Sequence, residues 1–307
     1  MRISKIRRFL VWFQIRIIGN LHFFNTKKRK RIRDKIKGRV LCKTLKRYVI
    51  AAENIPLTKS AKDDENEKIF ALWFQGEKNA PPLVQSCWRS IRRNCPQKLI
   101  ILDDKTLPDF INLPGYIIDK RRNGKIKTAN FSDIARMELL HNHGGYWMDS
   151  TDFVTAPIPK FISDSDFFVF LTGPKICSYS FIQSCFIRSR KNTYLINALR
   201  EVVFEYWKYE PKSIDYFTFH LLLRALVENN PIAAMEFTKM PHVNQDPTHR
   251  LWFQEGAADG HYWADKPFDR KKFDELTSGA FFQKLNFKDK NAQYPIPESF
   301  ADVIIKM

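Results

Sequence analysis

Short apolar runs alternate with segments of helical periodicity through the middle of the chain. The apolar runs have the length of buried strands and stand at residues 69–74, 98–103 and 146–149. Helices are predicted between them, from Pro81-Pro82 to about Asn94 and from near Thr128 to Gly144-Gly145. Proline is tolerated in the first turn of a helix, and glycine often follows the last turn. Strand, helix, strand, helix, strand is the order of an α/β sheet with parallel pairs.

The pattern changes after the third strand. Two further strands are predicted at 167–171 and 180–187, and the helical segments 192–209 and 213–229 follow them as a cap on the sheet. A stretch at 242–262 is rich in His, Gln, Asp and Gly, and we interpret it as an irregular loop able to act as a mobile lid. The expected fold class is therefore α/β, with a mixed sheet flanked by helices and a helical C-terminal cap.

Polar side chains follow three of the predicted strands. In open α/β sheets, ligands bind at the carboxyl ends of the strands. Residues 73–76, Asp103-Asp104 and residues 149–152 are therefore expected to lie along one rim of the sheet.

Positive charge is concentrated near the N-terminus. The 307 residues include 51 Lys and Arg against 33 Asp and Glu, a net charge of +18. Residues 1–50 hold 17 of these bases and a single acid, Asp34, so the rest of the chain is close to neutral. A near-neutral body with a basic arm argues against a protein that wraps nucleic acid over its whole surface. We place the basic arm and a polar linker at 1–65 and the main domain at 66–307.

The arm contains an apolar stretch, residues 9–24, that polar and charged residues interrupt. It falls short of the roughly 20 predominantly apolar residues of a spanning helix, and it lacks the small-residue cleavage site of a secretory signal. Apolar anchors such as Trp12 and Phe13 between basic clusters are typical of a helix in the interface of an anionic membrane. A basic docking arm for RNA or another protein is the alternative.

Cysteine and histidine patterns argue against two kinds of site. The five cysteines are odd in number and form no CxxC pair, which disfavours structural zinc and a disulfide framework. Reduced thiols in the cytosol fit this pattern best. His141 and His143 lie near each other but lack further ligands at metal spacing.

The segment 127–153, KTANFSDIARMELLHNHGGYWMDSTDF, is the most informative part of the chain. Its turn Asp149-Ser150-Thr151-Asp152 presents two carboxylates and two hydroxyls after a strand. A hard divalent cation such as Mg²⁺ or Mn²⁺ takes oxygen ligands, commonly one or two carboxylates together with substrate phosphates. The turn therefore fits a metal-bridged diphosphate, although most acidic turns are solvated loops.

An acid and a base stand close together on the helix before this turn. Asp133 and Arg136 are three positions apart, so they share one helix face, beside apolar positions. Such a pair can bind polyhydroxyl groups, since the carboxylate accepts hydrogen bonds and the guanidinium donates them. A structural ion pair is the alternative interpretation.

Two segments, ALWFQGEKNAPPLVQSCWRSIRRNCP and KTANFSDIARMELLHNHGGYWMDST, resemble the capsular polysaccharide synthesis family of sugar transferases. That family is related to bacterial and yeast transferases with the D-x-D signature and to the glucosyltransferase domains of clostridial toxins. The resemblance is strongest over 68–158, weaker over 180–228 and 273–288, and absent from the basic arm. It implies a GT-A-like fold, which is a Rossmann-like nucleotide-sugar-binding sheet, and transfer of a hexose from a nucleotide diphosphate donor.

The resemblance assigns donor-binding residues position by position. Trp73 matches a strand-end Trp that stacks on the uracil of a UDP-sugar, an interaction suited to its large flat face. Phe74 and Gln75 beside it are expected in the same donor site. Asp133 and Arg136 match the acid and base that hold the hydroxyls of the donor sugar.

The same resemblance makes the acidic turn a D-x-D motif. Asp149 matches its first Asp, which reaches the ribose and the metal. The third motif position is Thr151, so either Thr151 or Asp152 completes the metal site. Trp147 and Ser150 are expected to contact the donor. The expected catalytic residues are Asp133, Arg136, Asp149 and Asp152.

Near the C-terminus, SGAFFQKLNFK (278–288) resembles the segment that closes over the diphosphate. Relatives often have His before the Lys, whereas this chain has Gln283, so metal binding from this side is in question. Lys284 is expected to neutralise phosphate charge, and Ser278 or Glu275 to supply an oxygen to the metal.

The resemblance thus implies a metal-dependent glycosyltransferase, with Mn²⁺ or Mg²⁺, that moves a hexose from a UDP-sugar to a glycan or lipid-linked glycan. The product would be a capsular or other cell-surface polysaccharide, with retention of configuration. Asp215, in a segment that matches the family, and His220 are expected on the acceptor side. The arm would hold a cytoplasmic bacterial enzyme at the anionic inner face of the cell membrane, and no specific nucleic acid is expected.

Two other functions stay open at this point. One is a membrane- or nucleic-acid-binding adaptor on an inactive transferase-like body, which predicts no UDP binding. The other is a phosphosugar transferase on the same fold, because an acidic turn would serve a diphosphate in either reaction.

Overall fold

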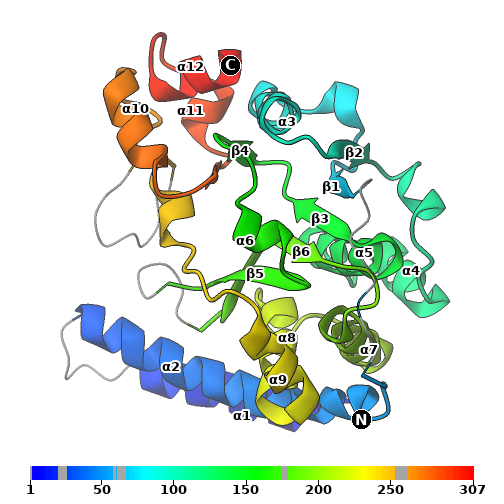
Figure 1. Cartoon of the computed structure of the whole chain (residues 1–307). Coiled ribbons are helices and arrows are strands. Elements are labelled where there is room, and N and C mark those ends of the chain that lie inside the picture. Colours follow the sequence, from blue (N-terminus) through cyan, green and yellow to red (C-terminus); the bar gives the residue numbers. More distant parts are fainter. Residues whose placement is uncertain (1, 20–25, 58–59, 61–66, 174–178, 253–261) are drawn as a thin grey trace.

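The structure, a computed structural model, describes residues 2–19, 26–57, 60, 67–173, 179–252 and 262–307. A five-stranded sheet lies at its centre, in the order β2-β1-β3-β6-β5 (Figure 1). The strands are β1 (Lys68–Leu72), β2 (Lys98–Leu102), β3 (Gly145–Met148), β5 (Phe167–Leu171) and β6 (Ile182–Ser189). β1 is parallel to β2 and β3, whereas β6 is antiparallel to β3 and β5. The predicted mixed sheet with parallel pairs is therefore confirmed.

The two predicted crossover helices are confirmed as α3 (Pro82–Asn94) and α5 (Thr128–His143). Alternate residues of β1 and β3 enter different apolar clusters, because successive side chains of a strand point to opposite faces. Phe70 and Trp147 belong to the cluster that α5 completes. Ile69 and Tyr146 belong to the cluster that contains Trp88 of α3.

The predicted cap is confirmed as a group of helices that packs on α5 and on itself. It consists of α7 (Tyr194–Tyr209), α8 (Thr218–Asn229) and α9 (Pro231–Lys239). Shorter helices complete the body, namely α4 (Gly115–Arg122), α6 (Lys160–Ser163), α10 (Arg270–Thr277), α11 (Lys290–Gln293) and α12 (Phe300–Lys306). Within the expected loop 242–262, residues 246–249 form a short 3₁₀ turn. Residues 253–261, where a mobile lid was expected, lie outside the described residues.

A separate two-stranded sheet joins the middle of the chain to its C-terminal part. β4 (Asp152–Val154) pairs antiparallel with β7 (Phe282–Lys284), as Figure 1 shows between the green and red-orange segments. The register sets Asp152 opposite Lys284 and Phe153 opposite Gln283. This pairing brings the C-terminal segment to the end of β3, where the acidic turn lies.

The N-terminal arm is helical and lies along one side of the body (Figure 1, blue). It comprises α1 (Lys5–Gly19), α2 (Thr26–Leu45) and a 3₁₀ segment, Lys46–Ala52. Leu41, Leu45 and Tyr48 are buried in the same apolar cluster as α7 and α8. Among the described residues no helix is both long and apolar enough to span a bilayer. The boundary at residue 65 stays a prediction.

Two glycines at the junction of α5 and β3 adopt backbone conformations that other residues rarely adopt. Gly144 has φ +67° and Gly145 has φ +91°. A Cβ on Gly145 would lie 2.4 Å from the carbonyl oxygen of Lys68 in β1. A side chain at Gly145 would therefore push β3 away from β1, directly before the acidic turn.

We predict that Gly145→Ala lowers the free energy of unfolding by about 2 kcal/mol or more, because strain at positive φ adds to the clash with β1. Urea titration measures this loss. Gly115→Ala is the matched control, since a Cβ there meets nothing within 4 Å. If both substitutions lowered the free energy of unfolding by the same small amount, the close contact between Gly145 and β1 would be contradicted.

Candidate functional site

The predicted rim is present at the carboxyl ends of β1, β2 and β3. The amide of Trp73 donates to the carbonyl of Leu102, 2.9 Å away, and the Ser150 hydroxyl donates to the carbonyl of Leu72 at 3.0 Å. These bonds hold the end of β1 between the residues that follow β2 and β3. Asp103, by contrast, caps its own turn through the amides of Lys105 and Thr106.

The acidic turn is folded back on itself. The Asp152 amide donates to the Asp149 carbonyl at 2.9 Å, and the Asp149 amide donates to Asp152 Oδ2 at 3.2 Å. Trp147 donates its indole N–H to Asp149 Oδ1 at 2.8 Å. The turn therefore presents Asp149, which is partly exposed, above Asp152, whose side chain is fully buried.

Lys284 lies at the centre of the turn. Its ammonium donates to Asp149 Oδ2 and to Thr151 Oγ1, both at 2.7 Å. Asp152 Oδ1 is 3.3 Å from the same nitrogen but is not aligned for a hydrogen bond. The β4–β7 register places Lys284 here. The lysine expected to neutralise phosphate charge is therefore hydrogen-bonded directly to the acidic turn.

Arg136 lies near the other carboxylate oxygen of Asp149. One of its terminal nitrogens, Nη2, is 3.5 Å from Asp133 Oδ1 and 3.5 Å from Asp149 Oδ1. Nη1 donates to the Ser184 hydroxyl of β6 at 2.7 Å, and the guanidinium lies 4.9 Å from the centre of the Trp147 ring. Asp149 is thus held between two cations.

These charges shift the pKa values of the three acids in different directions. Burial would raise the pKa of Asp149, but Lys284 and then Arg136 outweigh it and hold that pKa below its ordinary value. Burial raises the pKa of Asp133 to about 7, against the smaller opposing effect of Arg136. Burial likewise raises the pKa of Asp152 to about 7 against Lys284. Asp149 therefore carries the permanent negative charge of the group.

The expected donor residues after β1 lie beside these charges. Trp73 is partly exposed, meets the edge of Phe287 at 5.0 Å between ring centres, and has no hydrogen-bond partner for its indole N–H among the described residues. Phe74 contacts Phe131 and the guanidinium of Arg121, whereas Gln75 is exposed.

The two expected acceptor residues occupy different surroundings. Asp215 forms an ion pair with Lys37 of α2 at 2.7 Å. His220 is buried, and its Nδ1 has no hydrogen-bond partner in the described structure. Burial, then the charge of Arg136, lowers the pKa of His220 to about 3, so the ring is neutral. His220 is thus close to the charged group, whereas Asp215 is bonded to the arm.

The oxygens expected to bind a metal ion surround an ammonium instead. The three oxygens of Asp149, Thr151 and Asp152 face Lys284 Nζ. The Ser278 hydroxyl donates to the carbonyl of Glu275 within the end of α10. Among the described residues, no cluster of three or more His, Cys, Asp and Glu is placed to hold a metal ion. As the side chains lie, the turn does not fit Mn²⁺ or Mg²⁺, and that cofactor stays a prediction.

Gln283 has a structural position beside the site. Its side-chain oxygen accepts from the amides of Arg250 and Leu251, and its Nε2 donates to the Pro247 carbonyl at 2.9 Å. The residue at the position where relatives often have His therefore ties the 3₁₀ turn 246–249 and the two residues after it to β7.

Sequence analysis missed Ser184, Phe287 and Arg121. Each contacts an expected site residue. Ser184 and Arg121 belong to no motif of their own, so only the strand and helix order could place them at this rim. Phe287 lies in the 278–288 segment that resembles the family, but the resemblance does not single it out.

We predict that Asp133→Asn gains stability relative to the wild type as pH rises. The native carboxyl keeps its proton to about pH 7, whereas in the unfolded chain its pKa is 3.8, so wild-type stability falls as pH rises through this window. Asn does not titrate. The difference in free energy of unfolding should therefore shift by about 2 to 3 kcal/mol in favour of the variant between about pH 5 and about pH 8. Urea titrations at both pH values measure it, and a difference independent of pH would contradict the raised pKa.

Comparison with known proteins agrees with this architecture. The family described as "Capsular polysaccharide synthesis protein" matches residues 19–303, which include the sheet, the acidic turn and Lys284. Searches of curated proteins and of solved structures found no match. Because the match covers most of the chain, the protein belongs to the capsular polysaccharide synthesis family.

Proposed function

We propose that the protein is a glycosyltransferase that moves a hexose from a nucleotide diphosphate sugar to a hydroxyl of a glycan acceptor. The family supports a role in capsular polysaccharide synthesis. The observation that carries the enzymatic proposal is the line of alternating charges Arg136–Asp149–Lys284. It lies beside the carboxyl ends of the parallel strands β1, β2 and β3, the position where open α/β sheets bind their ligands.

Each group in the donor site has a role suited to its surroundings. The Trp73 ring, partly exposed at the end of β1, offers a flat face to the uracil of a UDP-sugar. Asp133 and Arg136 bind hydroxyls of the sugar. Asp149, ionised between its two cations, accepts hydrogen bonds from the ribose. Arg136 and Lys284 stabilise the negative charge that builds up on the departing diphosphate.

The acceptor enters next to His220. Its ring is neutral, and its buried Nδ1 has no partner among the described residues, so in the tautomer protonated at Nε2 this nitrogen would accept a hydrogen bond from an acceptor hydroxyl that reached it. A nitrogen with a pKa of about 3 is a weak base, which favours proton transfer to the leaving phosphate instead. Attack on the face that the diphosphate leaves would retain the anomeric configuration and needs no protein nucleophile.

The arm supports attachment of this enzyme to an anionic membrane surface. Apolar side chains cover the outer face of α1 with exposed fractions of 45–73%, namely Ile6, Phe9, Leu10, Trp12, Phe13 and Ile17. Basic residues flank them, and a helix of this kind lies in the interface of a bilayer. Lipid-linked acceptors reside at such a surface, so the arm would hold the enzyme next to its acceptor.

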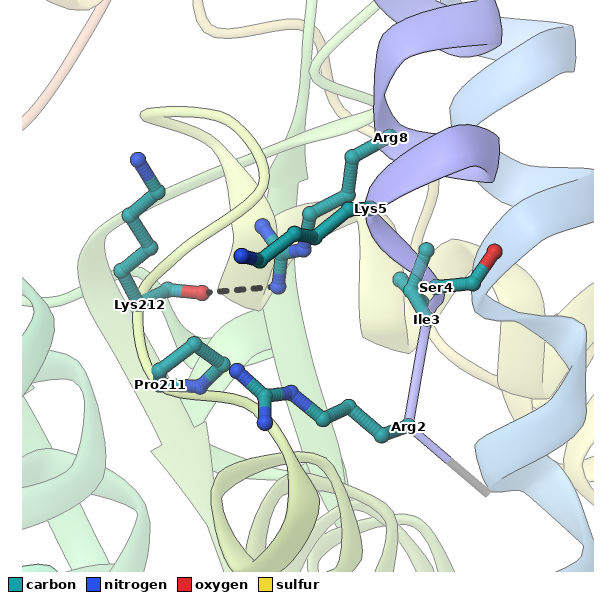
Figure 2. A pocket seen from close by; sticks show the side chains of 7 residues that line it. All are labelled: Arg2, Ile3, Ser4, Lys5, Arg8, Pro211 and Lys212. Atoms are coloured by element: carbon teal, nitrogen blue, oxygen red, sulfur yellow. Dashed lines mark hydrogen bonds between the residues drawn. The ribbon is translucent and has the colours of Figure 1, made fainter.

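A basic pocket adjoins this helix at its N-terminal end (Figure 2). It has a volume of about 480 Å³, and the side chains of Arg2, Lys5 and Arg8 enter it from the arm, with Lys212 opposite. Arg8 is already paired with the buried Glu210. The other cations are exposed and suit the phosphate groups of anionic lipids, each contributing about 1 kcal/mol.

We predict that Asp149→Asn lowers hydrolysis of the preferred nucleotide sugar by about 100-fold, because it removes the charge that orients Arg136 and Lys284. A screen of nucleotide sugars for released nucleotide identifies the donor first. Asp109→Asn, at an exposed acid away from this turn, is the control.

Unchanged turnover in a folded Asp149→Asn variant would remove the acidic turn from the reaction. Absence of any nucleotide binding by the wild type would favour the adaptor on an inactive body.

We also predict that the double substitution Phe9→Ser and Trp12→Ser weakens binding to phosphatidylglycerol-containing vesicles at least tenfold, because two apolar side chains no longer enter the bilayer. Co-sedimentation measures binding, and donor hydrolysis should stay unchanged. Tyr294→Ser removes an aromatic that is 75% exposed elsewhere and is the control. Equal binding by all variants, or salt-sensitive binding to RNA in place of vesicles, would contradict the membrane role.

A further inference from the structure

The Lys284 ammonium lies among the oxygens that were expected to bind a metal ion. A divalent ion binds oxygen at about 2.0–2.6 Å, and the acidic turn would have to supply those oxygens. The same Asp149 and Thr151 oxygens already lie 2.7 Å from the Lys284 ammonium. An ion bonded to both oxygens from the side that Lys284 occupies would stand against the ammonium nitrogen. The ammonium and the divalent ion therefore exclude each other.

The ammonium is held firmly in this place. Lys284 is the last residue of β7 and pairs with Asp152 across the two-stranded sheet. The amide of the next residue, Leu285, donates to the Thr151 carbonyl at 2.9 Å, which extends the pairing. To make room for a metal ion, the ammonium would have to give up its hydrogen bonds to Asp149 and Thr151, and its charge would have to move elsewhere in a mostly buried site, which is costly.

One N–H of the ammonium remains for a ligand. An ammonium has three N–H groups, and two of them go to Asp149 and Thr151. Asp152 Oδ1 lies at 3.3 Å without hydrogen-bond geometry. The Lys284 side chain as a whole is 20% exposed, so the residue is not sealed inside the protein. An oxygen of a diphosphate can therefore reach the third N–H without displacing the other two bonds.

We propose that Lys284 is an internal cation that replaces the divalent metal, so that donor cleavage by this enzyme needs no metal ion. The inference rests on the proposed glycosyl transfer. In that step, the bond between the anomeric carbon and the β-phosphate oxygen breaks, and its electron pair stays on that oxygen. A new bond forms from the anomeric carbon to the acceptor hydroxyl, or to water in hydrolysis, and the proton passes to the departing phosphate. Lys284 and Arg136 bind the negative charge that this leaves on the diphosphate.

The first test uses the wild-type protein and needs no substitution. After treatment with EDTA, binding of the donor nucleotide is measured by calorimetry, and donor hydrolysis is measured by nucleotide release. Both should agree within about twofold with values in excess Mn²⁺, because the cation is covalently part of the chain. The free-Mn²⁺ signal in electron paramagnetic resonance should show no bound ion in the nucleotide-free protein.

The second test replaces the cation. Lys284→Gln should lose hydrolysis in EDTA by about 100-fold, as expected when a charged donor to the leaving group is removed. The vacated oxygens should then bind Mn²⁺, detected as loss of the free-ion signal, and Mn²⁺ should partly restore hydrolysis. Lys284→Arg should keep more activity than Lys284→Gln in EDTA, because it keeps the charge. Lys271→Gln, at an exposed lysine of α10, is the matched control and should behave as the wild type.

The outcomes separate this inference from the proposed function. Donor binding or hydrolysis that requires Mn²⁺ in the wild type would overturn the internal cation and leave the transferase function in place. Full activity of Lys284→Gln in EDTA would do the same. No nucleotide-sugar binding with or without Mn²⁺ would overturn both.

Discussion

The contact between Lys284 and the acidic turn determines how the functional part of this molecule is built. Asp149 is ionised and only partly exposed, and the Asp152 side chain beneath it is fully buried, so this turn needs a cation within reach. The chain supplies that cation from more than one hundred residues away, through the β4–β7 pairing. The same contact therefore closes the C-terminal part of the fold and forms the centre of the site.

Arg136 extends this contact into a short network of charges. It reaches Asp149 from α5 and is itself fixed by Ser184 of β6 and by the ring of Trp147. Two cations thus face one permanent anion at the edge of the sheet. A diphosphate would meet positive charge that is already oriented, which is the form of electrostatic stabilisation that costs least during the reaction.

The sheet order and the rim could be predicted from the sequence because local signals were strong. Glycines after α5, the proline before α3 and the apolar runs of the strands each mark an element. The partners of the site could not be predicted, since Lys284 meets Asp149 only through the β4–β7 register. The sequence predicts an arm distinct from the main domain, yet Tyr48 is buried in the body and Lys37 pairs with Asp215. Long-range packing of this kind leaves no pattern in a single sequence.

A crystal structure with UDP bound in the presence of EDTA tests the central claim most directly. We expect the uracil to lie on the Trp73 ring and a β-phosphate oxygen to lie within hydrogen-bond distance of Lys284 Nζ. Arg136 would contact the same phosphate or the sugar beyond it. UDP bound elsewhere, or a phosphate held away from Lys284 by a metal ion on Asp149, would contradict the account.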